Sequence, residues 1–135
     1  MIIKRKIQLH EVDSAGLLFF ANLFTLAHSC YEEIMESYGT PITKIIENKS
    51  YSLPIIHAEA DYKLPIRHGD SLEISVQVDM IGNSSFTLLT KFIVNDNRET
   101  VAAQVRTVHV AINHEPIPLP AEIIELLHKI SPENF

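Results

Sequence analysis

The spacing of hydrophobic and polar residues changes once along the chain, from a helical period to a strand period. In residues 21–38 the apolar side chains recur three and four positions apart, which is typical of a helix with one wide apolar stripe. Gly39 can adopt the left-handed conformation that ends a helix, and Pro41 cannot continue one. We therefore predict a long helix at residues 21–38, largely covered by other structure, and a short helix or loop at residues 42–48.

Other segments have the composition and the alternation of β-strands. They are residues 2–9, 55–63, 71–81, 86–95 and 101–113. Residues suited to turns separate the later strands, at positions 68–70, 82–84 and 95–98. The pattern predicts three successive strands joined by hairpins, an antiparallel meander, and then a short amphipathic helix at residues 118–130.

A lone hydrophobic helix that precedes a long meander is most easily buried when the sheet curves around it. The order of elements therefore predicts an α+β fold, in which a curved antiparallel five-stranded sheet wraps a long central helix. No internal repeat, low-complexity tract or linker divides the sequence, so residues 1–135 are expected to form a single domain.

Composition narrows the class of protein. With 46% hydrophobic and 21% charged residues, the chain is expected to be globular. Its single cysteine, Cys30, excludes an intramolecular disulfide and a cysteine-rich zinc site, and suits a reducing cytoplasm. The N-terminus becomes charged too early for a signal peptide, and no run of about 18 apolar residues suggests a membrane span. A net charge of -6 disfavours contact with nucleic acid or an anionic membrane, so small-molecule chemistry is favoured.

The segment before the long helix carries an acidic side chain on a turn. Residues 13–16 read Asp-Ser-Ala-Gly, and Leu-Leu-Phe-Phe-Ala-Asn follows at residues 17–22. A helix N-terminus offers unpaired N–H groups that can polarise a carbonyl, and a carboxylate on the adjacent turn can attack it. This segment is thus a candidate acyl-transfer site. The alternative is that Asp13 only accepts hydrogen bonds from the amides of its own turn.

The string at residues 13–22, with His28 and Glu32 after it, resembles the signature of the 4-hydroxybenzoyl-CoA thioesterase family. It is especially similar to members that hydrolyse 1,4-dihydroxy-2-naphthoyl-CoA. The resemblance in detail covers only about the first 40 residues. It implies the hotdog fold and hydrolysis of an aryl-CoA thioester to the free acid and CoA. No metal or bound cofactor is implied, because coenzyme A is part of the substrate.

The resemblance also implies roles for individual residues. Asp13 would be the nucleophile or general base, and Gly16 would let the backbone approach the substrate closely. The backbone N–H of Phe20 would donate a hydrogen bond to the thioester oxygen. A second branch of hotdog thioesterases uses a carboxylate within the central helix, which would be Glu32 or Glu33 here, but the Asp-x-Ala-Gly turn favours Asp13.

Several residues are candidates for binding the substrate. Five aromatic residues can line an aryl pocket, although such residues more often belong to the core: Phe19, Phe20, Phe24, Tyr31 and Tyr62. His28 and Glu32 share a helix face, so they either lie near the acyl group or pair with each other. Glu11 is interpreted as a solvated neighbour of the turn. Coenzyme A phosphates have candidate partners in a set of basic residues: Lys63, Arg67, Lys91, Arg98 and Arg106. Acyl carrier protein remains an alternative carrier.

Other motifs lack the context that their chemistry requires. Gly-Asp-Ser-Leu at residues 69–72 spells a serine-esterase motif, but Ser71 is expected to open a strand in mid-chain. The seven histidines show no metal-binding spacing. Cys30 lies on the apolar stripe and is expected to be a small buried hydrophobic residue.

The expected sheet leaves an edge strand exposed, which predicts an edge-paired homodimer, doubled into a homotetramer, with the substrate lying across two chains. Two other functions remain as alternatives to hydrolysis. One is a ligand-binding hotdog protein that senses acyl-CoA without turnover. The other, ranked lower, is a dehydratase that would pair Asp13 with His10.

Overall fold

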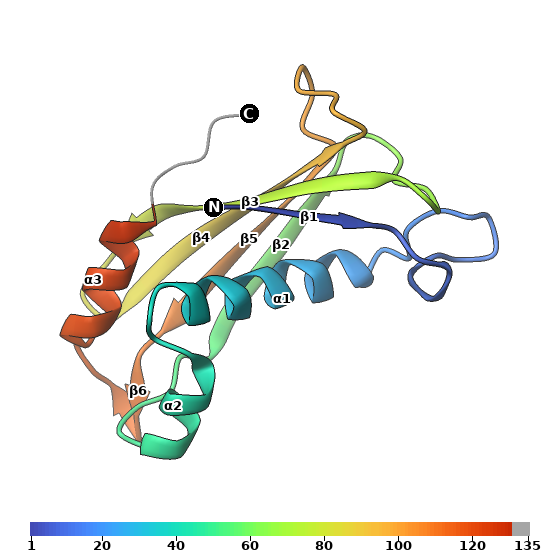
Figure 1. Ribbon diagram of the computed structural model, residues 1–135. Coiled ribbons are helices and arrows are strands. Elements are labelled where there is room, and N and C mark those ends of the chain that lie inside the picture. The colour runs from blue at the N-terminus through green and yellow to red at the C-terminus, as the bar shows by residue number, and fades with distance from the viewer. Residues whose placement is uncertain (131–135) are drawn as a thin grey trace.

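The computed structural model describes residues 1–130. Five strands form one antiparallel sheet in the order β1-β3-β4-β5-β2, and the sheet curves over one long helix, α1 (Figure 1). The strands are β1 (Ile2–Lys6), β2 (Ile55–Tyr62), β3 (Ser71–Ile81), β4 (Ser85–Val94) and β5 (Ala103–Val110). The helices are α1 (Asn22–Ser37), α2 (Ile42–Asn48) and α3 (Ala121–Lys129). A small hairpin pairs β6 (Ile112–Asn113) with β7 (Glu115–Pro116).

The meander predicted from the sequence is confirmed. Strands β3, β4 and β5 follow one another through hairpins, and Ile81 pairs with Phe86 across the turn at Gly82. Strands β1 and β2 flank α1 in the sequence and join opposite edges of the meander, β1 beside β3 and β2 beside β5. The chain therefore crosses one face of the sheet as α1 on its way from one edge to the other.

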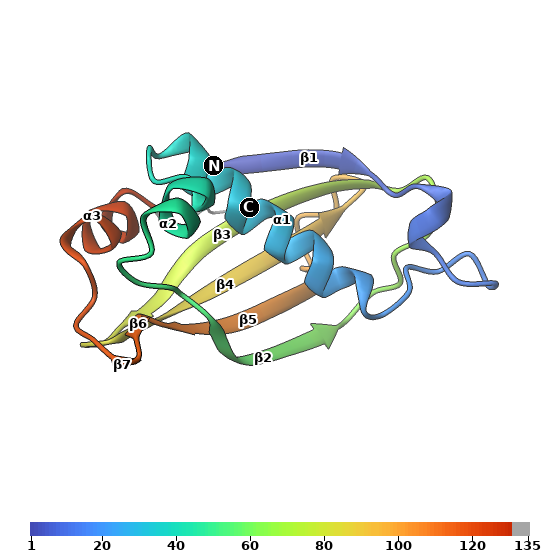
Figure 2. The same ribbon diagram turned by 90° about the horizontal axis from the view of Figure 1, so that it is seen from below.

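Helix α1 buries its apolar stripe against the sheet. The buried residues of the stripe are Leu23, Leu26, Ala27, Cys30, Tyr31, Ile34 and Met35. Outside this stripe, His28, Ser29 and Glu32 are exposed. Figure 2 shows α1 crossing the sheet at an angle, so that β2 lies to one side of it. The curved sheet covers the apolar stripe of the central helix, as predicted.

Two strands are shorter than predicted, each for a local reason. Strand β1 ends at Lys6 because Leu9–Glu11 form a 3-10 helix, in which the Glu11 carboxylate accepts a hydrogen bond from the Gln8 N–H at 2.9 Å. Strand β5 ends at Val110, where the Ala111 N–H donates to the Ser84 carbonyl at 2.8 Å and the chain turns into the β6–β7 hairpin. In that hairpin His114 takes a positive φ of 65°.

Candidate active site

The turn at Asp13 is closed by short-range hydrogen bonds. The Asp13 N–H donates to the Leu17 carbonyl at 2.8 Å, and the Gly16 N–H donates to the Asp13 carbonyl at 3.0 Å. Gly16 has φ +77°, a left-handed conformation that favours glycine, and a Cβ there would meet nothing within 4 Å. The glycine is therefore required by the backbone conformation of the turn rather than by crowding within this chain.

The two oxygens of the Asp13 carboxylate have different surroundings. Oδ1 accepts hydrogen bonds from the N–H groups of Ala15, at 2.9 Å, and Leu17, at 3.1 Å. Within residues 1–130, Oδ2 has no hydrogen-bond partner, and the residue is exposed. Asp13 thus does satisfy the amides of its own turn, as the alternative interpretation held. The same hydrogen bonds fix the carboxylate while leaving one oxygen open to a substrate or a water molecule.

Glu11 lies beneath this turn, and the prediction that it is a solvated neighbour is wrong. It is 5% exposed, and its carboxylate forms an ion pair with Arg5 at 3.0 Å. Its backbone carbonyl accepts hydrogen bonds from the Phe19 N–H, at 3.0 Å, and from the Asn22 side-chain amide, at 2.9 Å. Glu11 is buried because it anchors the 3-10 helix to both β1 and the start of α1.

The start of α1 leaves a backbone donor available. The helix begins at Asn22, two residues after Phe20, and the Phe20 carbonyl accepts hydrogen bonds from the Leu23 N–H and the Tyr62 hydroxyl. Within the described part of the chain, the Phe20 N–H has no acceptor. The Phe20 side chain is 63% exposed and packs on Phe19, with ring centroids 5.0 Å apart. An unpaired N–H at a helix start can stabilise negative charge on a carbonyl oxygen.

A second segment of the chain is held against the turn. The Leu18 N–H donates to the Ile66 carbonyl at 2.8 Å, and the His68 N–H donates to the Gly16 carbonyl at 2.9 Å. Beside these contacts is a hollow of about 370 Å³, lined by Leu17, Leu18, Tyr62, Lys63, Leu64, Pro65 and Ile66. Tyr62, predicted to bind substrate, therefore lies next to the turn, with its hydroxyl directed at the backbone of Phe20.

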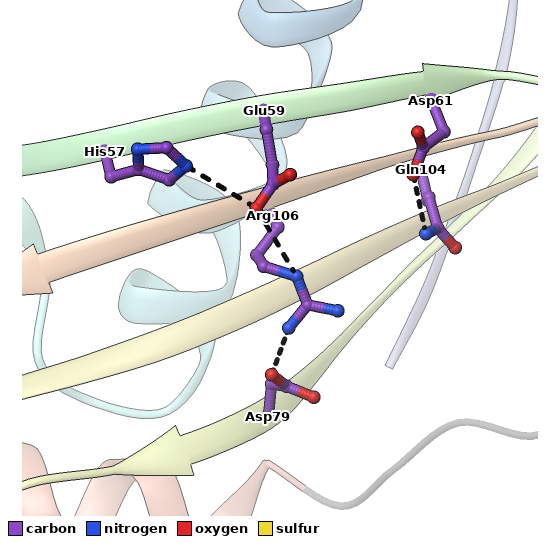
Figure 3. Close-up of polar contacts among 6 residues, drawn as sticks. All are labelled: His57, Glu59, Asp61, Asp79, Gln104 and Arg106. Atoms are coloured by element: carbon purple, nitrogen blue, oxygen red, sulfur yellow. Dashed lines mark hydrogen bonds and ion pairs between the residues drawn. The ribbon is translucent and has the colours of Figure 1, made fainter.

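Lys91, one of the five basic residues proposed for phosphate binding, is half-buried on β4, and the other four fall into two groups. Arg106 lies among carboxylates on the sheet, where it forms ion pairs with Asp79 and Glu59 (Figure 3). Arg98 forms an ion pair with the buried Glu73 at 2.6 Å. By contrast, Lys63 and Arg67 are exposed, and their side chains form no ion pair with any residue in the range 1–130. Lys63 and Arg67 lie close to the turn, because the carbonyl of Ile66, which stands between them in the sequence, accepts a hydrogen bond from the Leu18 N–H.

His28 and Glu32 line two neighbouring cavities. One, of about 410 Å³, lies between α1 and strands β2, β4 and β5, and the other, of about 730 Å³, extends toward α2. Both side chains contribute to both cavities, and within residues 1–130 they form no ion pair with each other. Glu33 is exposed and lines neither cavity. The structure brings His28 and Glu32 together at a ligand-sized space, and leaves their role a prediction.

Two buried polar residues complete the smaller cavity. Tyr31, on α1, and His109, on β5, have rings 4.8 Å apart, and His109 stacks on Phe86 at 4.7 Å. The pKa of His109 is lowered to about 4, mainly by burial and to a lesser extent by the nearby His28, while a hydrogen bond with the Leu53 backbone partly opposes the shift. Burial also raises the pKa of the Tyr31 hydroxyl far above its usual value. Both side chains are therefore neutral at neutral pH.

Sequence reasoning included Tyr31 among the aromatic residues that can line an aryl pocket, but it missed His109, which was one of seven scattered histidines. Alternation along β5 places His109 on the inner face of the sheet, which was the available signal, but it does not reveal that a tyrosine lies opposite.

Comparisons with known proteins bear directly on this geometry. A family model described as the thioesterase-like superfamily matches residues 7–127. The chain belongs to this superfamily. A 1,4-dihydroxy-2-naphthoyl-CoA hydrolase of Prochlorococcus marinus is 32% identical, with 100% of this chain and 91% of that relative covered. A protein of the same name from Nostoc punctiforme is also 32% identical, over 91% of this chain and 83% of the relative.

Solved structures agree on the fold. A 1,4-dihydroxy-2-naphthoyl-CoA thioesterase from Synechocystis superimposes with a TM-score of 0.87 at 23% identity, covering 96% of each chain. A gentisyl-coenzyme A thioesterase has a TM-score of 0.82 at 20% identity, covering 95% of this chain and 99% of its own. The predicted hotdog fold and the predicted class of enzyme, a thioester hydrolase, are confirmed.

The structure also places three other residues that the sequence analysis considered: Ser71, His10 and Cys30. Ser71 opens strand β3 and is exposed, and His10 is exposed in the 3-10 helix. Cys30 is buried, and burial raises the pKa of its thiol to about 12.

Among residues 1–130, no three histidine, cysteine, aspartate or glutamate side chains are grouped so as to hold a metal ion. None of the helices in that range has the length and apolar character needed to cross a bilayer.

Proposed function

We propose that this protein hydrolyses an aryl-CoA thioester to the free acid and CoA, with a 1,4-dihydroxy-2-naphthoyl-like acyl group as the preferred class. The observation that carries the proposal is the pairing of an Asp13 carboxylate that has one open oxygen with an unpaired Phe20 N–H just before α1. The names of the relatives at 32% identity support the aryl acyl group.

In the proposed reaction the substrate carbonyl oxygen accepts a hydrogen bond from the Phe20 N–H. In one route Asp13 removes a proton from an attacking water molecule, the C–S bond breaks, and that proton passes to the CoA thiolate. In the other route Asp13 attacks the carbonyl carbon itself and the C–S bond breaks to leave a mixed anhydride, which water then hydrolyses to the free acid, restoring the carboxylate and supplying the proton for the thiolate. A thioester carbonyl is already electrophilic, so positioning and an oxyanion donor supply most of what is needed, and the scheme requires no metal or bound cofactor.

Lys63 and Arg67 are the residues proposed to meet the phosphates of coenzyme A. Their side chains are exposed, flank the catalytic turn and form no ion pair in the described part of the chain. Arg98 and Arg106 are instead engaged with carboxylates. A long flexible phosphate-bearing carrier can be held by two exposed cations at modest affinity.

The protein is also proposed to act as a homodimer that pairs through β2. This edge strand is exposed along almost its whole length, with Ile56 62% exposed, and it lacks lysine and proline. The opposite edge, β1, carries Lys4, Arg5 and Lys6, which protect an edge from pairing. Ile56→Lys should give monomers in light scattering, whereas the matched change Met80→Lys on β3 should not. A tetramer, and a cytoplasmic location suggested by the lone cysteine, remain predictions.

The first experiment is thiol release from a panel of aryl-CoA and fatty acyl-CoA thioesters by the wild type and by Asp13→Asn. Rapid turnover of an aryl-CoA that this substitution abolishes, in a protein that stays folded, is the expected result. Rapid turnover by Asp13→Asn would overturn the assigned mechanism. Binding of acyl-CoA without any cleavage would replace hydrolysis by the sensor function.

A further inference from the structure

The peptide plane that carries the Phe20 N–H is fixed by the residues around it. The Phe19 carbonyl, which belongs to the same plane, accepts a hydrogen bond from the Asn22 N–H at 2.8 Å. The Phe19 N–H, in the plane before it, donates to the Glu11 carbonyl at 3.0 Å. Because a trans peptide is planar, the Phe20 N–H points opposite to the Phe19 carbonyl, which is directed into the helix. This donor therefore faces away from α1.

The next peptide plane, between Phe20 and Ala21, is held less firmly by the helix itself. The Leu23 N–H reaches the Phe20 carbonyl only at 3.3 Å, which is long for this type of hydrogen bond. Ala21 occupies the N-cap position, and no side chain caps the helix there. Helix ends without a capping side chain fray readily. The direction of the Phe20 N–H depends on the planes on both sides of this residue, so a second support for its carbonyl matters.

Tyr62 provides that support from the sheet. Its hydroxyl donates a hydrogen bond to the Phe20 carbonyl. Tyr62 is the last residue of β2 and pairs with Ala103 on β5, and the N–H groups of the next two residues, Lys63 and Leu64, both donate to the Ala102 carbonyl, at 2.8 and 2.9 Å. The tyrosine backbone is thus fixed at its base, and its hydroxyl joins the sheet to the start of α1.

The same contact limits what the Tyr62 hydroxyl can do for a ligand. A tyrosine hydroxyl has one proton to donate, and here the Phe20 carbonyl accepts it. Burial raises the pKa of this hydroxyl above its usual value, so it stays protonated at neutral pH. The prediction that Tyr62 binds the substrate would require this proton to change partner, whereas support of the helix start uses the contact as it stands.

We propose that Tyr62 is a positioning residue, which holds the Phe20 carbonyl and so keeps the neighbouring Phe20 N–H aligned with the thioester oxygen. This inference rests on the proposed thioester hydrolysis and adds a residue to it. A donor whose direction is already fixed stabilises the charge that develops on the carbonyl oxygen in the transition state, without reorganising during the reaction. Loss of that alignment should therefore lower kcat rather than raise KM.

The first test is Tyr62→Phe, which removes one hydroxyl from a side chain that is 49% exposed and should leave the protein folded. Complete loss of an oxyanion donor costs about 100- to 1,000-fold in kcat, so misalignment should cost part of that, about 5- to 50-fold. KM should stay within about twofold of the wild type. The matched control is Tyr38→Phe, which removes a hydroxyl at the C-terminal end of α1 and should change neither constant. An unchanged kcat, or a higher KM alone, would overturn the inference.

A second measurement separates positioning from direct contact with the substrate. The probe is phenacyl-CoA, a ketone in which a CH₂ group separates the sulfur from the carbonyl, so that it cannot be hydrolysed. At saturation in ¹⁵N-labelled protein, the Phe20 amide proton should shift downfield as it donates to the ketone oxygen, and the shift should be smaller in Tyr62→Phe. An equal shift in the two proteins would overturn the inference, because Tyr62 would then contact the ligand itself or serve only stability.

Failure of the proposed function can be told apart from failure of this inference. If the wild type cleaves no thioester, the function fails, and the Phe20 amide shift with phenacyl-CoA still tests the role of Tyr62. A shift that depends on Tyr62 would uphold the inference. The absence of a shift in both proteins would overturn it, since the Phe20 N–H would then meet no carbonyl.

Discussion

The turn at Asp13 and the cavity at Tyr31 and His109 are built in opposite ways. Within residues 1–130, the hydrogen bonds to the Asp13 carboxylate come from the Ala15 and Leu17 N–H groups, no more than four positions away, and the residue is exposed. Tyr31 and His109 come from a helix and a strand far apart in the sequence, and both are buried. The first site is local and solvated, while the second exists only in the folded chain.

This difference has an energetic consequence. Water can solvate the open oxygen of Asp13, so keeping it ready for reaction costs the fold little. The buried Tyr31 hydroxyl has no such compensation within residues 1–130, and an unsatisfied buried group costs about 1–3 kcal/mol. Changes at the turn should therefore affect activity most, and changes at Tyr31 and His109 should affect stability most.

The largest effect is expected from Asp13→Asn and Asp13→Ala. Both remove the reactive carboxylate, so kcat should fall by about 100- to 10,000-fold. Only Asp13→Ala also removes the acceptor of the Ala15 and Leu17 N–H groups, which should lower the free energy of unfolding by about 0.5–2 kcal/mol, as for a lost helix cap. Thiol release and urea unfolding measure the two effects.

Glu99→Gln, on the exposed loop between β4 and β5, is the control for loss of a carboxylate. If Asp13→Asn stays within about threefold of the wild-type kcat, a loss far below that typical of a missing acid or base, Asp13 serves only to close its turn.

The pH dependence of stability should distinguish the cavity from the turn. Folding lowers the pKa of His109 from 6.5 to about 4, so below pH 6.5 the unfolded chain takes up a proton that the native protein does not. Stability from this residue is therefore present above pH 6.5 and lost as the pH falls toward 4, by on the order of 3 kcal/mol. Urea unfolding at pH 7 and at pH 4.5 should show this loss.

His109→Phe keeps a ring on Phe86 but cannot titrate, so its stability should change less between the two pH values. His28 and the other histidines remain in both proteins, which isolates the contribution of His109. Equal pH dependence in the two proteins would mean that His109 is not held neutral by burial.

Glu11 supports the turn from below, and Glu11→Gln should destabilise the protein more than it slows the reaction. Loss of the buried charge opposite Arg5 should cost about 1–3 kcal/mol of unfolding free energy. The fall in kcat should be far smaller than for Asp13→Asn, because Glu11 holds Phe19 through its backbone carbonyl. Thermal unfolding and thiol release test this, with the exposed Glu33→Gln as control. A loss of activity equal to that of Asp13→Asn would contradict the supporting role.

The smallest effect is expected at the exposed cations beside the turn. Lys63→Ala and Arg67→Ala should each raise KM by about two- to fivefold at low salt, with kcat unchanged, because exposed ion pairs contribute little. The difference should shrink as salt is added. Steady-state kinetics at two salt concentrations measure it, with Lys44→Ala on α2 as control. If instead Arg106→Ala alone raises KM, the phosphates bind elsewhere.

Much of the fold could be predicted because its signals are local. The stripe of α1, the turn at Gly82 and the strand segments each depend on residues a few positions apart, and their observed bounds lie close to the predicted ones. The placement of β2 beside β5 was not predicted, because hydrogen bonding between distant strands leaves no mark in the spacing of either. The burial of Glu11 was missed for the same reason, since Arg5 and the 3-10 helix provide its surroundings.

By itself the sequence determined the secondary structure, the Asp13 turn and the superfamily, because these depend on short-range backbone preferences and on a contiguous motif. Only the tertiary structure decided which cations stay unpaired beside the turn, which sheet edge lies open, and that the rings of Tyr31 and His109 pack together at the wall of a cavity. Those features depend on how distant residues pack, and burial is what turns an ordinary tyrosine and an ordinary histidine into a neutral pair.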